Sequence, residues 1–189
     1  MFELKKSAKT ETMKLAKTKA KEIVKQGKEL AKNIDDRKLK KEVKRCAKMQ
    51  AKTLLTKTRI SLFLQKDQAA EGKDIVREVV ENIDTTTISN DLPRMARKLL
   101  AVKKTLGIKK CAKMEVAFGL EVMKLFLSGS IIKAIEIYSD KEFIIDTYES
   151  IAQKISMAKM KINFGDICIW IKRALIEYNT SFDLEAAAV

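Results

Sequence analysis

The sequence predicts an all-α protein, on the evidence of its composition and of its hydrophobic periodicity. Ala, Lys, Leu, Met and Glu are abundant, whereas the 189 residues include only six Gly and one Pro. Apolar residues recur every three or four positions through most of the chain, as in amphipathic helices. With 46% apolar residues the chain can bury a core. We therefore expect a long basic helical hairpin packed on, or projecting from, a multi-helix bundle.

The distribution of charge divides this expected architecture into two parts. Residues 2–66 contain 21 Lys and Arg against 7 Asp and Glu, whereas the residues after 66 contain 18 of each. The whole net charge of +14 thus belongs to the N-terminal third. We predict a Lys-rich basic helical hairpin over residues 1–66 and an amphipathic helical bundle with a frayed C-terminal tail over residues 67–189.

Two lysine-rich helices are expected in the first part. In the helix predicted over residues 4–33, basic residues spaced three or four apart share one face: Lys14, Lys17, Lys21, Lys25, Lys28 and Lys32. Small residues form its inward face: Ala8, Ala16, Ala20, Gly27 and Ala31. Asp35 or Asp36 is expected to cap a second helix over residues 37–65, although one continuous helix is an alternative. The second helix repeats the basic stripe with Lys38, Lys41, Arg45, Lys48 and Lys52.

Polarity changes after residue 66. Residues 67–84 predict an amphipathic helix with an acidic face, which is expected to lie across the hairpin in the same chain or to pair between copies: Glu71, Asp74, Glu78 and Glu81. Residues 85–90 predict a loop, followed by a helix that Asp91 caps, with Pro93 in its first turn, and that Gly107 ends. A second cationic patch lies between Arg94 and Lys113, and its predicted nucleic-acid contacts are Arg94, Arg97, Lys98, Lys103, Lys104, Lys109 and Lys110.

The remaining sequence predicts further helices over residues 108–127, 131–138, 139–161 and 167–178. Ser128-Gly129-Ser130 separates the first two, and Ser139 to Glu142 form an expected capping box. Asn163-Phe164-Gly165 is expected to stop the third helix, and Asp166 to cap the last one. The tail from Thr180 is expected to fray.

Several classes of chemistry lack the residues they need. The chain has no His, which excludes Ser-His-Asp catalysis, Cys-His catalysis and His-ligated metals. Cys46, Cys111 and Cys168 are predicted to be reduced, mostly buried thiols, because they are far apart and form no CxxC pair. Glu142, Asp146 and Glu149 share a helix face that we interpret as solvated. We therefore predict no catalytic residue, metal, cofactor or small-molecule substrate, and no enzymatic activity.

The expected location is intracellular, either cytoplasmic or within a virion or nucleoprotein particle. The N-terminus has neither the apolar core of a signal peptide nor the Arg-rich composition of a transit peptide. The longest apolar stretch, residues 116–127, contains Glu121 and Lys124 and is too short to span a bilayer. We therefore predict a protein that is neither secreted nor transmembrane.

The lysine stripes predict contact with a polyanion through its phosphates. Residues 2–66 contain 18 Lys but only three Arg and two aromatic residues, Phe2 and Phe63, so base reading and base stacking are not expected. The leading hypothesis is a non-enzymatic structural protein that binds or packages nucleic acid non-specifically and self-assembles into a homo-oligomer or filament, as a nucleocapsid or chromatin protein does. The alternative to polyanion contact is a solvated coat that keeps the helices soluble.

The layout of a basic helical hairpin followed by shorter helices resembles the ESCRT-III family of membrane-remodelling polymers. This resemblance implies a second hypothesis, a membrane-surface assembly protein in peripheral contact with anionic lipid. The chain departs from the family in lacking an acidic C-terminal segment, since residues 114–189 have a net charge of only −3. A basic subunit of a large ribonucleoprotein is a third hypothesis.

Overall fold

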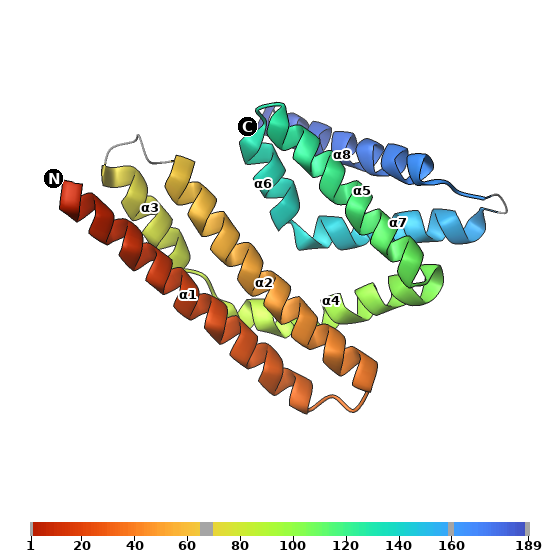
Figure 1. Ribbon diagram of the computed structural model, residues 1–189, viewed down its shortest axis with the longest axis horizontal. Coiled ribbons are helices and arrows are strands. Elements are labelled where there is room, and N and C mark those ends of the chain that lie inside the picture. The colour runs from red at the N-terminus through yellow and green to blue at the C-terminus, as the bar shows by residue number, and fades with distance from the viewer. Residues whose placement is uncertain (1, 65–69, 159–160, 188–189) are drawn as a thin grey trace. The chain divides into compact units, whose positions relative to one another are not determined.

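The computed structural model describes residues 2–64, 70–158 and 161–187, and these residues are almost entirely helical. The helices are α1 (Phe2–Lys32), α2 (Arg37–Leu64), α3 (Ala70–Glu81), α4 (Thr85–Leu106), α5 (Ile108–Leu127), α6 (Ile131–Ser139), α7 (Lys141–Met157) and α8 (Phe164–Ala187) (Figure 1). No strand occurs among the described residues, so the all-α prediction is confirmed. Packing separates two compact units, Met1–Arg97 and Lys98–Val189, which are described in turn.

In the first unit, α1 and α2 lie side by side and run in opposite directions (Figure 1). Asp36 caps α2, because its Oδ1 atom accepts hydrogen bonds from the backbone N–H groups of Lys38 at 2.7 Å and Leu39 at 3.2 Å. The chain therefore breaks between the two helices, and the alternative of one continuous helix is wrong.

Small side chains let α1 and α2 approach closely. Ala16, Ala20 and Ala31 are buried, as the sequence predicts, whereas the side chain of Ala8 lies outside the described residues. At Gly27 an added Cβ would lie 2.5 Å from the Cβ of Ala47. Glycine is therefore required there by the neighbouring helix and not by an unusual backbone conformation.

The acidic helix α3 packs against α1 and α2 of the same chain. Val76 and Val80 are buried together with Ala16 of α1 and Leu62 of α2. Arg77 also forms an ion pair with Glu11 of α1 at 3.5 Å. α3 thus lies against the hairpin of the same chain, but it packs through its apolar side. Glu78 and Glu81 of the acidic face are exposed, and Glu81 pairs with Arg77 of α3 itself.

The segment that we expected to be a loop, residues 85–90, is helical and begins α4. Asp84 caps it, accepting hydrogen bonds from the backbone N–H groups of Thr86 at 2.9 Å and Thr87 at 3.3 Å, so the predicted cap Asp91 is wrong. The hydroxyl of Thr87, which also donates to Asp84, lowers the pKa of this carboxyl group most, and the two backbone hydrogen bonds lower it further. Pro93 consequently lies inside α4 and not in its first turn. Gly107 has φ of 75° and follows the end of α4, as predicted.

The second unit has a core of large side chains contributed by the end of α4 and by α5, α6, α7 and α8. Its fully buried members include Met114, Ile137, Ile151 and Ile171, and Trp170 packs against it, as predicted. Cys46 and Cys111 are buried and Cys168 is half-buried, and none of the three forms a disulfide. Burial raises the pKa of the Cys111 thiol, with a smaller contribution from Glu115.

Two predicted caps are corrected by one to three residues. α7 is capped by Asp140, whose carboxylate accepts from the backbone N–H of Phe143 at 2.9 Å, while the hydroxyl of Ser139 donates back to Ile135 in α6. α8 is capped by Asn163, whose Oδ1 accepts from the N–H of Asp166 at 2.9 Å, while Asp166 accepts from the N–H of Asn163 at 3.0 Å. α7 ends at Met157, earlier than expected, and α8 continues to Ala187.

Candidate nucleic-acid interface

The lysine row of α1 lies on its solvent side. All six of the predicted residues are exposed: Lys14, Lys17, Lys21, Lys25, Lys28 and Lys32. The buried row of the same helix, which includes Ala16, Ile23 and Ala31, is offset from the lysines by about a third of a turn or more. Helical geometry therefore places about one ammonium group every 5.4 Å along the helix axis.

The second row has the same relation to α2. Its five members are exposed: Lys38, Lys41, Arg45, Lys48 and Lys52. The buried residues of α2 lie on the other side of the helix and include Val43, Cys46 and Ala47. Both predicted rows are thus arranged as the spacing of the sequence requires.

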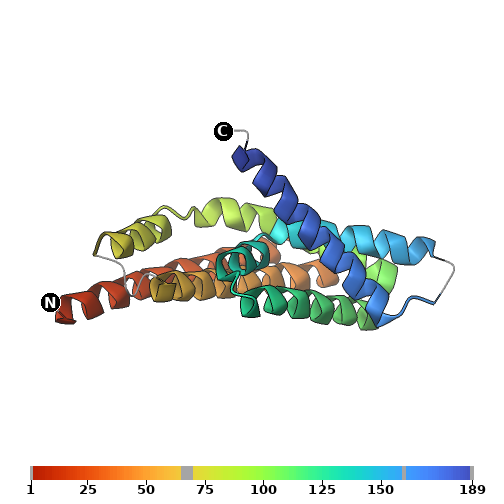
Figure 2. The same cartoon turned by 90° about the horizontal axis from the view of Figure 1, so that it is seen from above.

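The two rows belong to the same face of the α1–α2 layer. α3 and the start of α4 cover the other face (Figure 2). On that covered side Lys19 of α1 donates to the carbonyl of Ile83 at 3.0 Å, and Gln50 of α2 contacts Met95 at 3.5 Å. Lys19 and Gln50 lie outside the lysine rows, and helical periodicity turns those rows to the side of the layer opposite α3 and the start of α4. We refer to these eleven residues together as the lysine face.

Few acidic groups compensate the lysine face. Lys32 pairs with Glu29 at 2.7 Å, which lowers the pKa of that carboxyl group, and Arg45 pairs with Glu42 at 3.3 Å. The other nine residues make no ion pair with a described residue. Glu11 of α1 points toward α3, where it meets Arg77. The face therefore carries concentrated positive charge.

The second predicted cationic patch is divided between the two compact units. Arg94 and Arg97 belong to the first unit, and both are exposed. Arg94 lies 3.7 Å from Asp91. In the second unit Lys104, Lys109 and Lys110 are exposed and Lys103 is half-buried, whereas Lys98 is held by Asp146 at 2.7 Å. This ion pair also accounts for one of the three carboxylates on α7 that we expected to be solvated.

Three exposed basic residues extend the α2 row or lie beside it, although their spacing did not select them: Arg37, Lys44 and Arg59. Arg59 lies seven residues after Lys52 and so shares its side of the helix, and Lys44 lies next to Arg45. The spacing of seven was available in the sequence. It was obscured because position 56, one turn before, is Thr.

The chemistry of the lysine face suits phosphates better than bases. An ammonium group is a point charge without the planar fork that reads guanine, and Arg45 is the only guanidinium among the eleven residues. Phe63 is exposed but lies near the end of α2, eleven residues beyond Lys52. Base stacking along the face therefore has no platform.

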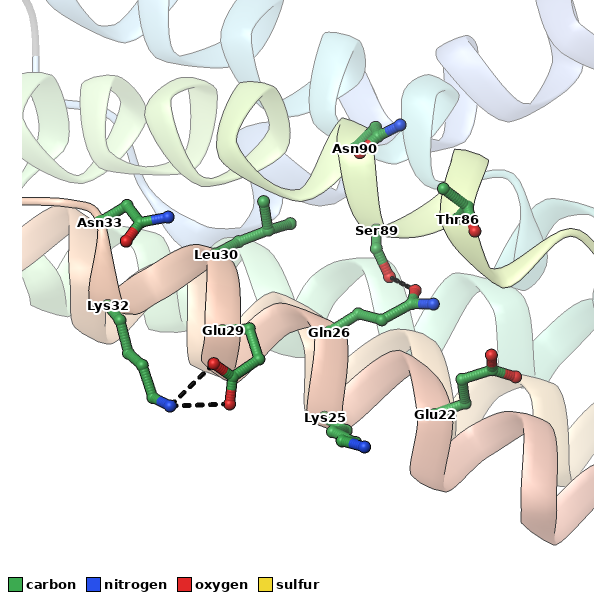
Figure 3. Close-up of a pocket in the computed structure, with 10 residues that line it drawn as sticks. All are labelled: Glu22, Lys25, Gln26, Glu29, Leu30, Lys32, Asn33, Thr86, Ser89 and Asn90. Carbon is green, nitrogen blue, oxygen red and sulfur yellow. Dashed lines mark hydrogen bonds and ion pairs between the residues drawn. The ribbon is translucent and has the colours of Figure 1, made fainter.

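A groove of about 470 Å³ lies between α1 and the start of α4 (Figure 3). Gln26 crosses it and accepts a hydrogen bond from the hydroxyl of Ser89 at 2.6 Å. Lys25 and Lys32 point away from α4 in this view, which agrees with the orientation of the lysine face. Among the described residues, no three His, Cys, Asp or Glu side chains are grouped so that they could hold a metal ion.

The comparisons with known proteins give no assignment. No protein-family model, no curated protein and no solved structure matches this chain. Within the described part of the chain, no helix has the length and apolar character needed to cross a bilayer.

Proposed function

We propose that this protein is a non-enzymatic structural protein that binds nucleic acid without reading its sequence and assembles on it. The observation that carries the proposal is the lysine face, where nine exposed ammonium groups in two parallel rows make no ion pair with a described residue. A nucleic acid that lies along such rows releases its condensed counterions, which drives binding at low salt. The basic hairpin of residues 1–66 is the contact surface in this proposal, and the rest of the chain supplies contacts between copies.

The packing of α1 on α2 supports the assembly part of the proposal. An alanine-lined seam buries less apolar area per residue than a leucine-lined one, so it contributes less free energy of folding. Neighbouring copies or the polyanion would add order to the hairpin. Nucleocapsid-like and chromatin-like packaging both fit this arrangement.

The decisive experiment measures binding to duplex DNA and to single-stranded RNA across a salt series. The quadruple variant Lys17→Glu, Lys21→Glu, Lys25→Glu and Lys28→Glu removes four phosphate contacts, so the salt slope of log K should fall by roughly 3 to 4 and the affinity at low salt by at least about 100-fold. Circular dichroism should show unchanged helicity, because all four side chains are exposed.

A matched control makes the same change of charge elsewhere. Lys154, Lys161, Lys172 and Arg173 are exposed in the second unit and lie outside the predicted contacts. Their replacement by Glu should leave most of the binding intact. An equal loss in both variants would show that binding follows net charge and not the lysine face. Flotation of the wild-type protein with anionic vesicles, without a nucleic-acid shift, would instead favour the membrane-surface hypothesis.

A further inference from the structure

Helix α5 has an exposed apolar face that is separate from its core-facing side. Cys111, Met114 and Phe118 point into the core of the second unit. Bulky side chains on another side of α5 are between 44% and 82% exposed: Ile108, Val116, Leu120, Met123, Phe126 and Leu127. Their spacing places them along one face together with Ala112 and Gly119. A surface helix ordinarily has one apolar stripe, so this second one, the α5 face, indicates a further contact.

Gly119 lies near the middle of α5, within the α5 face. Its backbone is not in the left-handed region, and a Cβ atom added there would meet nothing within 4 Å. Glycine is unfavourable in a helix interior compared with alanine, and no contact with the described residues requires it here. Gly27 shows the opposite case, since its Cβ would collide with Ala47. A second helix that approaches closely at Gly119 would explain the residue.

We infer that the α5 face binds the α5 face of a second copy of this chain, with the two helices antiparallel. A two-fold axis between positions 119 and 120 sets Leu120 against Gly119 of the second copy, so that the backbones approach most closely there. The same axis sets Met123 against Val116 and Leu127 against Ala112 of the second copy, so that each larger side chain meets a smaller one.

The size of the α5 face is adequate for such a pair. With large apolar side chains presenting about 150–250 Å² each when fully exposed, the six bulky residues expose on the order of 700 Å². This approaches the roughly 800 Å² per partner of a standard protein–protein interface. The inference rests on the self-assembly named in the proposed function, but it needs no nucleic acid.

Charge makes the pairing distinguishable from nucleic-acid binding. Lys109, Lys113 and Lys124 lie along one edge of the α5 face, and Glu121 holds Lys124 at 2.6 Å. An antiparallel two-fold pair brings this edge of both copies to the same side, where the lysines repel. Salt screens that repulsion and leaves apolar burial intact, so the dimer should strengthen as salt rises. A basic edge also suits anionic lipid, but a fluid lipid surface does not call for a glycine at the centre.

Sedimentation of the full chain, freed of nucleic acid and measured at high salt, tests the pairing. Met123→Glu should weaken the dimer at least about tenfold, since it places a charge in the centre of the contact. Ile169→Glu is the matched control, because Ile169 is a comparably exposed apolar residue of α8 outside the α5 face. Equal effects of the two variants, or a wild-type chain that stays monomeric at every salt concentration, would overturn the inference.

The substitution Gly119→Leu tests whether the α5 face binds a helix or a lipid surface. A Cβ atom added at Gly119 has no described atom within 4 Å, so the fold should be retained, yet the larger side chain blocks close approach and should abolish the dimer. An intact dimer would overturn the inference. So would a monomer that binds vesicles of anionic lipid more strongly than the wild type, which would assign the α5 face to a membrane.

The same variants distinguish failure of this inference from failure of the proposed function. Met123→Glu should keep the salt slope for DNA, since the lysine face is unchanged. The four-lysine variant should keep the high-salt dimer. Loss of DNA binding only in the lysine variant and loss of the dimer only in the α5 variants is the result expected if both are right.

Discussion

The α1–α2 contact of the first unit and the core of the second unit are built from different kinds of side chain. In the first unit the α1–α2 contact is built from small residues such as Ala16, Ala20 and Ala47, and Gly27 marks the closest approach. In the second unit the core contains Met114 and Ile171, both without exposed surface. Small residues bring two backbones together but remove little apolar area from water, whereas large residues do the reverse. The α1–α2 contact should therefore be most sensitive to added volume, and the core of the second unit to lost volume.

The largest effect is expected from lost volume in the second unit. Ile171→Ala removes a fully buried side chain and should cost about 2–5 kcal/mol in the free energy of unfolding, because a cavity remains. Trp170, the only tryptophan, reports on this unit by fluorescence during denaturant unfolding. A cost below about 1 kcal/mol would mean that the core collapses around the gap and that the comparison of the two units fails.

Two glycine substitutions test the comparison further. We expect smaller changes in the free energy of unfolding than for Ile171→Ala, with opposite signs at the two positions. Gly27→Ala should destabilise the first unit by about 1 kcal/mol net, because overpacking against Ala47 outweighs the gain in helix propensity. Gly119→Ala should stabilise the second unit by about 0.5–1 kcal/mol, since its Cβ meets open space. Hydrogen exchange measured peptide by peptide follows each unit separately. Changes of the same sign at both positions would contradict the structure.

The smallest change in the free energy of unfolding is expected at high pH, and it should be confined to the second unit. The hydroxyl of Tyr178 donates to Asp140 at 2.9 Å, and burial followed by this hydrogen bond raises the pKa of Tyr178 from 10.0 to about 12. The folded state holds the Tyr178 proton more tightly than the unfolded state does. The protonated hydroxyl therefore contributes fully to the free energy of unfolding below about pH 10, and this contribution is lost as the pH rises toward 12.

Absorbance titration should show a late ionisation that Tyr178→Phe removes, and the substitution should cost about 1 kcal/mol in the free energy of unfolding. All three tyrosines belong to the second unit, so the Trp170 signal should change without a parallel loss of protection in α1. A titration curve that Tyr178→Phe leaves unchanged above pH 10 would show that the hydrogen bond to Asp140 contributes little.

The sequence was most informative where a single helix determines the answer. The period of the lysines and of the small residues predicted which side of α1 is buried, and Gly107 and Gly129 predicted where helices end. Residues 85–90 were predicted wrongly, because Thr, Ser and Asn disfavour helix interiors in isolation. In the structure Thr85 and Ser89 are buried and Ser89 bonds to Gln26, so tertiary contacts override local preference.

The α5 face could not be predicted from the sequence. Residues 108–127 have apolar side chains on two sides, and periodicity alone does not say which side meets the core. In the sequence Glu121 interrupts an apolar run, yet in the structure it is buried and pairs with Lys124 at 2.6 Å. Only the packing of α6 and α8 against α5 shows that Met114 points inward and Met123 outward. The ion pair of Lys98 with Asp146, 48 residues away, likewise depends on the tertiary fold.

Asp140 lies at a junction of three helices, and this has a consequence for how the second unit opens. Its N–H donates to the carbonyl of Glu136 at the end of α6, one carboxylate oxygen caps α7 at Phe143, and the other receives the hydroxyl of Tyr178 in α8. Withdrawal of α8 would leave that carboxylate with one partner fewer and loosen the start of α7. The three helices should therefore exchange their amide protons as one cooperative group, with a single opening free energy, and not fray one after another.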